Sequence, residues 1–171
     1  MKKLLAILKW TGIGLMVIVI ALVLYVTLSF PPTFDAPQVE LRASTDSAVI
    51  ARGKYLVYGP AHCAECHVTM DRKNPGLHGA SFTSQPLTGG LVFTLPGGAL
   101  YAPNLTPDAE TGIGRYTDAE LARMIRHNTR PDNTIMLPFM YFGGVSDEDL
   151  IAIISYLRSA EPVKTSHPSN E

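Results

Sequence analysis

The chain contains few charged residues and only two cysteines. Asp, Glu, Lys and Arg make up 17% of its 171 residues, and the formal net charge is −1. Beyond residue 30 there are 11 basic and 15 acidic groups. Because nucleic-acid binding needs a basic surface, this balance argues against nucleic acid as a partner. Low charge together with 14 glycines and 13 prolines predicts a small domain with much loop and few long elements.

The two cysteines stand in the motif Cys63-Ala-Glu-Cys66-His67. Two thiols at this spacing, followed at once by a histidine, are the signature of covalent haem c attachment. The thiols add to the two vinyl groups and the imidazole ligates the iron. C-x-x-C alone is also compatible with a redox dithiol, half of a zinc site or a disulfide. No strand–helix alternation surrounds the motif, no second ligand pair serves zinc, and a disulfide needs no adjacent histidine. The sequence therefore favours one haem c, bound through Cys63, Cys66 and His67.

An uncharged apolar run lies near the N-terminus. From Trp10 to Phe30 there are 21 residues without a charge, enough for a helix of about 31 Å, close to the thickness of the hydrocarbon layer. Three lysines precede this run, so the positive-inside rule places the N-terminus in the cytoplasm. A cleaved signal peptide is the alternative, but its apolar core is shorter, about 7–15 residues. We therefore expect residues 1–30 to be a retained transmembrane anchor in membrane lipid, with the rest of the chain on the periplasmic side of a bacterial inner membrane.

The residues after the anchor predict one mainly α-helical domain. We expect a linker over 31–45, the domain over 46–162, and a flexible tail over 163–171. The first helix is expected from about Ser47 to Tyr58, with Asp46 or Ser44 as its N-cap. Gly53 lies inside this helix at a cost of about 1 kcal/mol, which indicates close approach of another helix.

Two further helices are expected near the C-terminus. Thr117-Asp118-Ala119-Glu120 matches a capping box and opens a helix to about Asn128. Ser146 precedes three acidic residues and opens the last helix, whose first turn suits the positive end of the helix dipole. The segment 83–106 is different in character. It predicts a short hairpin or an irregular loop, and this segment could supply a non-helical wall for a haem.

An iron held by His67 has one axial position left. A thioether there makes an electron-transfer site, whereas an open position makes a ligand-binding or catalytic site. Met136 and Met140 lie in a proline-containing loop before the last helix and are both candidates. His78 and His127 are rival ligands. His127 also belongs to a basic strip with three arginines, which could hold haem carboxylates, meet an acidic partner or simply face solvent.

Several blocks of the sequence together resemble the single-haem class I cytochrome c domains of bacterial membrane electron-transfer chains. The resemblance covers roughly residues 46–163. It is closest to membrane-anchored monohaem cytochromes and to the haem domains in the cytochrome subunits of periplasmic alcohol, aldehyde and gluconate dehydrogenases. The blocks that carry it are Ala51-Arg52-Gly53-Lys54-Tyr55-Leu56, Cys63 to His67, Pro103-Asn104-Leu105-Thr106-Pro107-Asp108, Thr111 to Asp118, Ser146 to Leu150, and Tyr156-Leu157-Arg158-Ser159.

The resemblance implies a class I cytochrome c fold in which the first and last helices cross beside the haem. Gly53 and Tyr156 match the glycine and aromatic residue that meet at that crossing. The family's axial methionine lies in the loop before the last helix, and Met140 in Leu137-Pro138-Phe139-Met140 fits this place. Some relatives place the ligand three residues earlier, where this chain has Leu137, so Met136 stays the alternative.

These features predict a one-electron carrier with His/Met-ligated haem c, and not an enzyme in its own right. The partners expected are membrane lipid and protein redox partners. A cytochrome subunit of a membrane dehydrogenase or oxidase complex is the alternative. A haem sensor or small peroxidase with an open sixth position is a third hypothesis.

Overall fold

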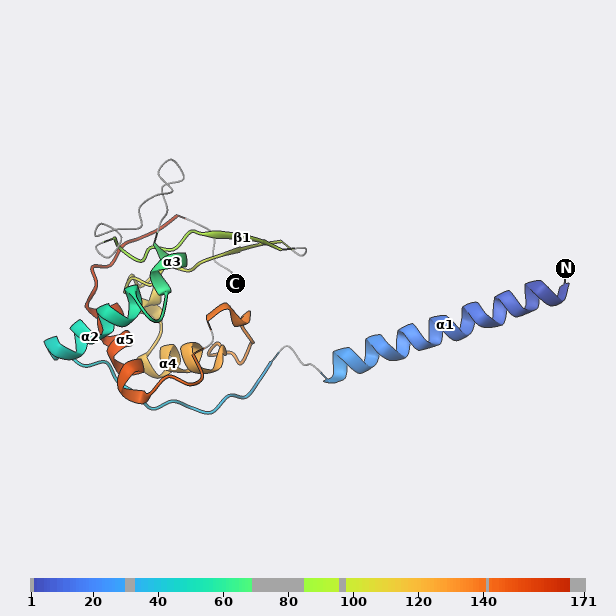
Figure 1. The fold of residues 1–171 in the computed structure, drawn as a ribbon, viewed down its shortest axis with the longest axis horizontal. Helices are drawn as coiled ribbons and strands as arrows, with labels where there is room; N and C mark the ends of the chain where they lie inside the picture. Colours follow the sequence, from blue (N-terminus) through green and yellow to red (C-terminus); the bar gives the residue numbers. More distant parts are fainter. Residues whose placement is uncertain (1, 30–32, 69–84, 96–97, 141, 167–171) are drawn as a thin grey trace.

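One long helix projects from a small helical domain in the computed structural model (Figure 1). The structure describes residues 2–29, 33–68, 85–95, 98–140 and 142–166. Helix α1 spans Lys2–Ser29, and none of its residues is buried. Its mean hydropathy reaches 2.5 over an 18-residue window, so it is long and apolar enough to cross a membrane. The expected N-terminal apolar helix is therefore present. It begins at Lys2, before the uncharged run, and so includes the three lysines.

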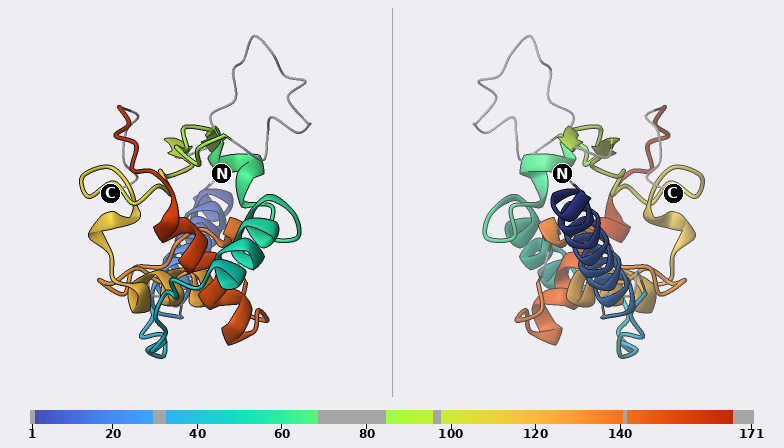
Figure 2. Two further views of the ribbon diagram at one scale, coloured as in Figure 1. Left: turned by 90° about the vertical axis from the view of Figure 1, so that its left-hand side faces the viewer. Right: turned by 90° about the vertical axis from the view of Figure 1, so that its right-hand side faces the viewer.

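Helices α2 (Ser47–Tyr58) and α5 (Asp147–Ser159) form the most extensive helix–helix contact of the described residues. Both begin at the expected caps. Asp46 accepts a hydrogen bond from the Ala48 amide, and Ser146 accepts one from the Asp149 amide. Each cap satisfies an amide that the helix itself leaves unpaired. The two helices cross in the views of Figure 2.

Gly53 is the point of closest approach between α2 and α5. A Cβ atom built at this position would lie 1.9 Å from the carbonyl oxygen of Ala152 and 2.7 Å from the Cβ of Tyr156. No other residue type fits there without moving one helix. The expected close approach at Gly53 is confirmed, and Tyr156 is the aromatic residue beside it.

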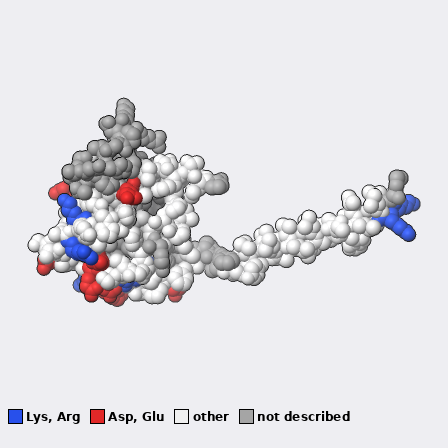
Figure 3. Space-filling view, in the orientation of Figure 1, with Lys and Arg blue, Asp and Glu red and all other residues white. Residues whose placement is uncertain are grey.

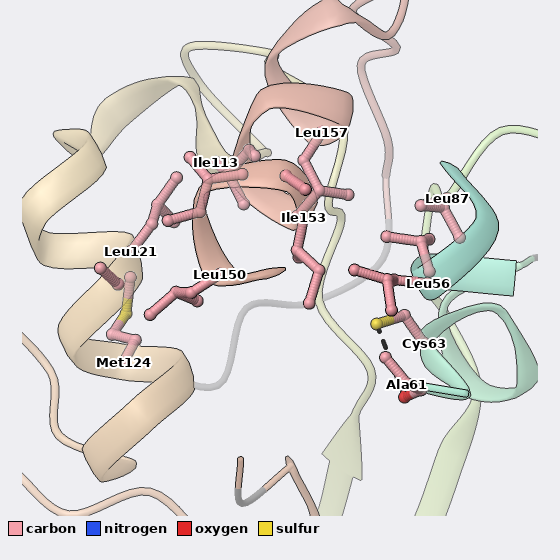
Figure 4. Close-up of a cluster of buried hydrophobic side chains, with 14 of the residues drawn as sticks. Leu56, Ala61, Cys63, Leu87, Ile113, Leu121, Met124, Leu150, Ile153 and Leu157 are labelled. Atoms are coloured by element: carbon pink, nitrogen blue, oxygen red, sulfur yellow. Dashed lines mark hydrogen bonds between the residues drawn. The ribbon is translucent and has the colours of Figure 1, made fainter. Parts of the chain in front are cut away.

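Helix α4 (Asp118–His127) closes the other side of the core. Thr117 and Glu120 form the expected capping box, and Asn128 ends the helix in the left-handed conformation at φ 51°. Figure 4 shows the core between α4 and α2, with Leu150 and Ile153 of α5 in the middle. Leu150 and Ile154 are fully buried, and each such side chain contributes about 1.5–3 kcal/mol through burial.

A two-stranded antiparallel hairpin lies within the segment 83–106. Strands β1 (Val92–Leu95) and β2 (Gly98–Tyr101) pair with Phe93 opposite Leu100. Main-chain hydrogen bonds continue the pairing below the strands, from the Ala102 amide to Leu91 and from the Leu105 amide to Leu87. The prediction of a mainly α fold with a small hairpin is confirmed. The short helix α3 (Cys63–His67) and two 3-10 turns, η2 (Ile113–Arg115) and η3 (Pro138–Met140), complete the described elements.

The segment expected as a linker lies against the domain over residues 33–45. Ala36 and Val39 are buried, and the Ala43 amide donates to Asp118 at 2.8 Å. The buried Arg123 guanidinium donates to the carbonyl oxygen of Ala36. Local sequence patterns do not reveal these contacts between residues 33–45 and the domain, because the partner Arg123 lies in α4, far along the chain. The domain bounds themselves remain a prediction.

Residues 163–166, expected within the tail, are held by the loop that follows β2. The Val163 carbonyl accepts a hydrogen bond at 2.7 Å from the amide side chain of Asn104, which is buried. The Val163 amide donates to Thr106, and the Thr165 amide donates to Thr111. This end of the described chain is therefore part of the folded domain.

Candidate functional site

A tight turn after α2 places the two cysteines and His67 on one short helix, α3 (Cys63–His67). The Ala61 amide donates to the Leu56 carbonyl at 2.9 Å, and the His62 amide donates to Gly59. His62 then adopts the left-handed conformation at φ 51°, which redirects the chain into α3. The 3-residue spacing of the cysteines brings both thiols to neighbouring positions on the helix.

Both cysteines carry free thiols. Cys63 is 5% exposed and lies beside Leu56 at the edge of the core (Figure 4), whereas Cys66 is half-buried. Burial raises the pKa of the Cys63 thiol to about 12 and also raises that of Cys66. A redox dithiol needs a thiolate of lowered pKa. The surroundings of this pair act in the opposite direction, which argues against that alternative.

The His67 side chain is 4% exposed and has a defined orientation. Its Nδ1 lies 2.7 Å from the carbonyl oxygen of Pro103. Because a carbonyl oxygen only accepts, Nδ1 carries the proton and Nε2 keeps a free lone pair. Burial lowers the pKa of His67 to about 4, and the hydrogen bond to Pro103 offsets this only in part. The imidazole is therefore neutral and oriented, as a metal-ligating histidine must be.

Gly89 lies tightly against the Pro103 carbonyl, and sequence analysis missed this close approach. The Gly89 amide donates to the His67 carbonyl at 2.7 Å. Its φ is +76°, and a Cβ there would lie 2.3 Å from the Ala102 oxygen and 2.5 Å from the Pro103 oxygen. Only glycine tolerates both the positive φ and the close carbonyl oxygens at this position. The Gly89-Gly90 pair directly before a strand signal is the feature of the sequence that could have identified this position.

The loop before α5 places both methionines against the core. Met136 and Met140 are half-buried and pack against the core cluster that includes Cys63. The Met136 amide donates to the Asn128 carbonyl at 2.7 Å, and Met140 ends η3. Burial is similar for the two side chains and does not distinguish between them.

The rival ligands have other surroundings. His127 is half-buried, and burial and then the neighbouring guanidinium groups lower its pKa. His78 lies outside the described residues. The basic strip around His127 is not one solvated face, because Arg123 is buried and donates to the Asn133 side chain and to two carbonyl oxygens.

The donor set fits a covalently attached haem better than it fits a bare metal ion. Among the described residues, no group of three or more His, Cys, Asp or Glu side chains could hold a metal ion. What α3 offers is two protonated thiols, which can form thioethers, beside one neutral imidazole with a free Nε2. This set is the one that the sequence motif predicted.

Comparison with known proteins identifies the family. The family model described as cytochrome c matches residues 50–161. The cytochrome c subunit of a quinone-dependent alcohol dehydrogenase from Gluconacetobacter polyoxogenes is 34% identical over 143 residues, covering 77% of this chain and 28% of that protein.

Two further relatives carry names of the same kind. The fructose dehydrogenase cytochrome subunit from Gluconobacter japonicus is 32% identical over 133 residues, covering 75% of this chain and 25% of that protein. The gluconate 2-dehydrogenase cytochrome c subunit from Pantoea cypripedii is 29% identical over 157 residues, covering 90% of this chain and 31% of that protein. The chain thus spans a third or less of the length of these relatives.

Proposed function

The chain belongs to the cytochrome c family, whose members bind haem c covalently, and on this basis we propose that it transfers single electrons through one haem c. The observation that carries the proposal is the neutral, oriented His67, one residue after Cys66 on α3. One C-x-x-C-H motif in the sequence supports a single haem. When bound, haem c supplies an iron that alternates between Fe(III) and Fe(II) and so carries one electron.

Three residues of α3 have distinct tasks in this proposal. Cys63 and Cys66 would form the two thioethers to haem c, and His67 would hold its iron through Nε2. The Pro103 carbonyl holds the His67 ring in one orientation and makes it a better donor. The buried side chains around Cys63 exclude water, which keeps the local dielectric low and limits reorganisation when charge changes.

Met140 is the proposed distal ligand, with Met136 as the alternative. Met140 ends η3, and its side chain packs against the core. Met136 is also half-buried, but the hydrogen bond from its amide to Asn128 ties its backbone to the end of α4. A thioether ligand fills the sixth position and favours electron transfer over binding of small ligands.

The proposed setting is the outer face of a bacterial inner membrane. Helix α1 is the anchor, and the three lysines before Trp10 keep its N-terminus in the cytoplasm. Because the relatives are named as dehydrogenase subunits, a second candidate role is the cytochrome subunit of a membrane dehydrogenase complex. Retention of a dehydrogenase through purification in mild detergent distinguishes such a subunit from a freely diffusing carrier.

Visible spectra of the purified protein and of two variants test the ligand assignment. Met140→Ala is expected to lose the weak sulfur-to-iron charge-transfer band of the oxidised protein and to bind CO when reduced. Met136→Ala, the matched control in the same loop, is expected to keep the band and to resist CO. If the band persists in Met140→Ala, Met140 is not the ligand. If the wild type already binds CO readily, the electron-carrier proposal gives way to a sensor or peroxidase.

Covalent attachment is tested separately. Haem staining should follow the polypeptide through denaturing electrophoresis, with one haem per chain by the pyridine haemochrome assay. The double variant Cys63→Ser/Cys66→Ser should lose this staining. Retention of stained haem in the double variant would contradict the role of the thiols.

A further inference from the structure

Four large apolar side chains are exposed in the loop that carries Met136 and Met140 and in the segment paired with it. Phe34 is 50% exposed, Ile135 48%, Leu137 49% and Phe139 56%. We refer to these four residues as the apolar patch. Within the loop, Met136 and Met140 pack against the core. The side chains of Ile135, Leu137 and Phe139 are exposed on the surface. A cluster of exposed apolar groups of this kind marks an interaction surface.

The apolar patch lies where the anchor joins the domain. Thr33 forms an antiparallel bridge with Thr134, and the Phe34 amide donates to the Asn133 carbonyl at 2.9 Å. The residue after Thr134 is Ile135, so the first described residues after α1 are pinned to the edge of the patch. From Ser29, the end of α1, to Thr33 the chain advances four residues, which span at most about 14 Å. This short tether keeps the patch close to the membrane surface whenever α1 spans the bilayer.

The patch is held in shape by the domain. Phe139 stacks on Phe93 of the hairpin, with ring centroids 5.3 Å apart and an interplanar angle of 20°. Ile135 is bridged to Thr129. In Figure 1, η3 and the hairpin lie on the side of the domain that faces α1, whereas α2 lies on the opposite side. The apolar patch is therefore a preformed surface on the anchor side.

Charge on this side of the domain is sparse. Figure 3 shows a largely uncharged surface toward α1, with Lys and Arg gathered on the side away from it. The charged groups next to the patch are one basic and two acidic residues: Arg130, which donates to the Thr134 hydroxyl at 3.3 Å, Asp35 beside Phe34, and Asp132 in the turn before Thr134, so the patch has no excess of positive charge. Attraction to anionic headgroups is therefore not what this surface offers. Aromatic and aliphatic side chains without neighbouring lysines suit shallow insertion into the interfacial region of the bilayer.

We propose that the apolar patch rests on the outer leaflet of the membrane that α1 anchors, with Leu137 and Phe139 in the interfacial layer. The contact fixes the rotation of the domain. The methionine loop then faces the lipid, and the exposed Tyr55 of α2 faces the periplasm. This inference rests on the proposed role of α1 as a retained anchor. It deepens that role, because the anchor alone leaves the domain free to turn.

Photo-crosslinking of the full-length haem protein tests the contact. A benzoylphenylalanine residue replaces Phe139, and a second variant carries it at Leu137 in case loss of the Phe93 stack disturbs the loop. Tyr55, 60% exposed on α2, is the matched control position. Each variant is reconstituted in phosphatidylcholine vesicles, and only protein that floats with the vesicles is irradiated. Protein that fails to float would refute the anchor itself, which separates that failure from failure of the patch.

Lipid adducts are expected in several-fold higher yield at positions 139 and 137 than at position 55. Addition of anionic lipid should leave the yields unchanged, because no basic cluster contributes. Equal or lower yields at 139 and 137 than at 55 would overturn the proposal. In membranes of the expressing cells, adducts to a protein instead of lipid at these positions would also overturn it, and would assign the patch to a protein partner.

Discussion

Substitution of Gly53 by alanine tests the packing of α2 on α5. An added Cβ would lie 1.9 Å from the Ala152 carbonyl oxygen, and ordinary contact begins at 3.4 Å, so the helices must separate by about 1.5 Å. Backbone atoms supply this contact, and a backbone cannot avoid it by a change of rotamer. Overpacking of this kind costs about 1–3 kcal/mol. Alanine also favours an isolated helix over glycine by about 1 kcal/mol.

Overpacking and helix propensity have opposite effects on stability, so the sign of the measured change shows which one dominates. We expect Gly53→Ala to lower the free energy of unfolding by up to about 2 kcal/mol net, and the melting temperature by up to roughly 10 °C. Thermal unfolding of the haem protein, followed by circular dichroism at the helix band, measures both. A melting temperature above that of the wild type would refute the close contact, because helix propensity would then act unopposed.

Gly144→Ala is the matched control. Nothing lies within 4 Å of a Cβ at Gly144, and this residue has no left-handed φ. The same chemical change should therefore leave stability within about 0.5 kcal/mol of the wild type. A loss as large as that of Gly53→Ala would show that added methyl groups destabilise this protein for reasons other than the helix crossing.

Three further predictions concern the capping box, the carboxyl group of Asp118, and the hydrogen bond between the His67 ring and the Pro103 carbonyl. Thr117→Ala should cost about 1 kcal/mol of stability in denaturant unfolding and Thr117→Ser much less, since the hydroxyl satisfies the Glu120 amide. Burial raises the pKa of Asp118, but hydrogen bonds from the Ala43 amide and Arg158 outweigh this and leave it below its ordinary value. Asp118 therefore adds stability above about pH 4, the unfolded value, and this is lost as pH falls through the lower folded pKa. Asp118→Asn should remove that part of the acid dependence, and equal acid unfolding curves would contradict it. Gly89→Ala should displace the Pro103 carbonyl and weaken its bond to the His67 ring, which raises the reduction potential measured by redox titration. An unchanged reduction potential would show that the hydrogen bond to Pro103 does not affect the donor strength of His67.

Much of the fold could be predicted from local signals. The starts of α2, α4 and α5 follow from Asp46, Thr117 and Ser146, because a cap is a contact within a few residues. The hairpin follows from two short apolar runs around Pro96-Gly97-Gly98. The contact at Gly53 was foreseen as well, because an unfavourable glycine inside a helix needs a tertiary reason.

The candidate site was only partly predictable, because only some of its residues lie close together in the sequence. The motif names Cys63, Cys66 and His67, because the spacing within one turn defines the chemistry. It does not name Gly89 or Pro103, which lie 22 and 36 residues beyond His67 in the sequence. The Gly89 amide donates to the His67 carbonyl, and the His67 ring donates to the Pro103 carbonyl. The buried role of Arg123 was not foreseen either. A cationic side chain on a short helix is normally solvated, and the burial of Arg123 depends on the carbonyl group of Ala36, 87 residues away, and on that of Arg130 just after α4.

The sequence by itself determined the family, the haem motif, the apolar helix and the helix boundaries, since each depends on residues a few positions apart. The tertiary structure decided how His67 is oriented and where the chain after α1 meets the domain. It also decided which side chains of the methionine loop point inward. These properties depend on contacts between segments that are far apart in the chain, and local propensity carries no record of such contacts. Met136 and Met140 pack on the core while Leu137 and Phe139 between them stay exposed, because the hairpin and the end of α4 hold the loop in that register.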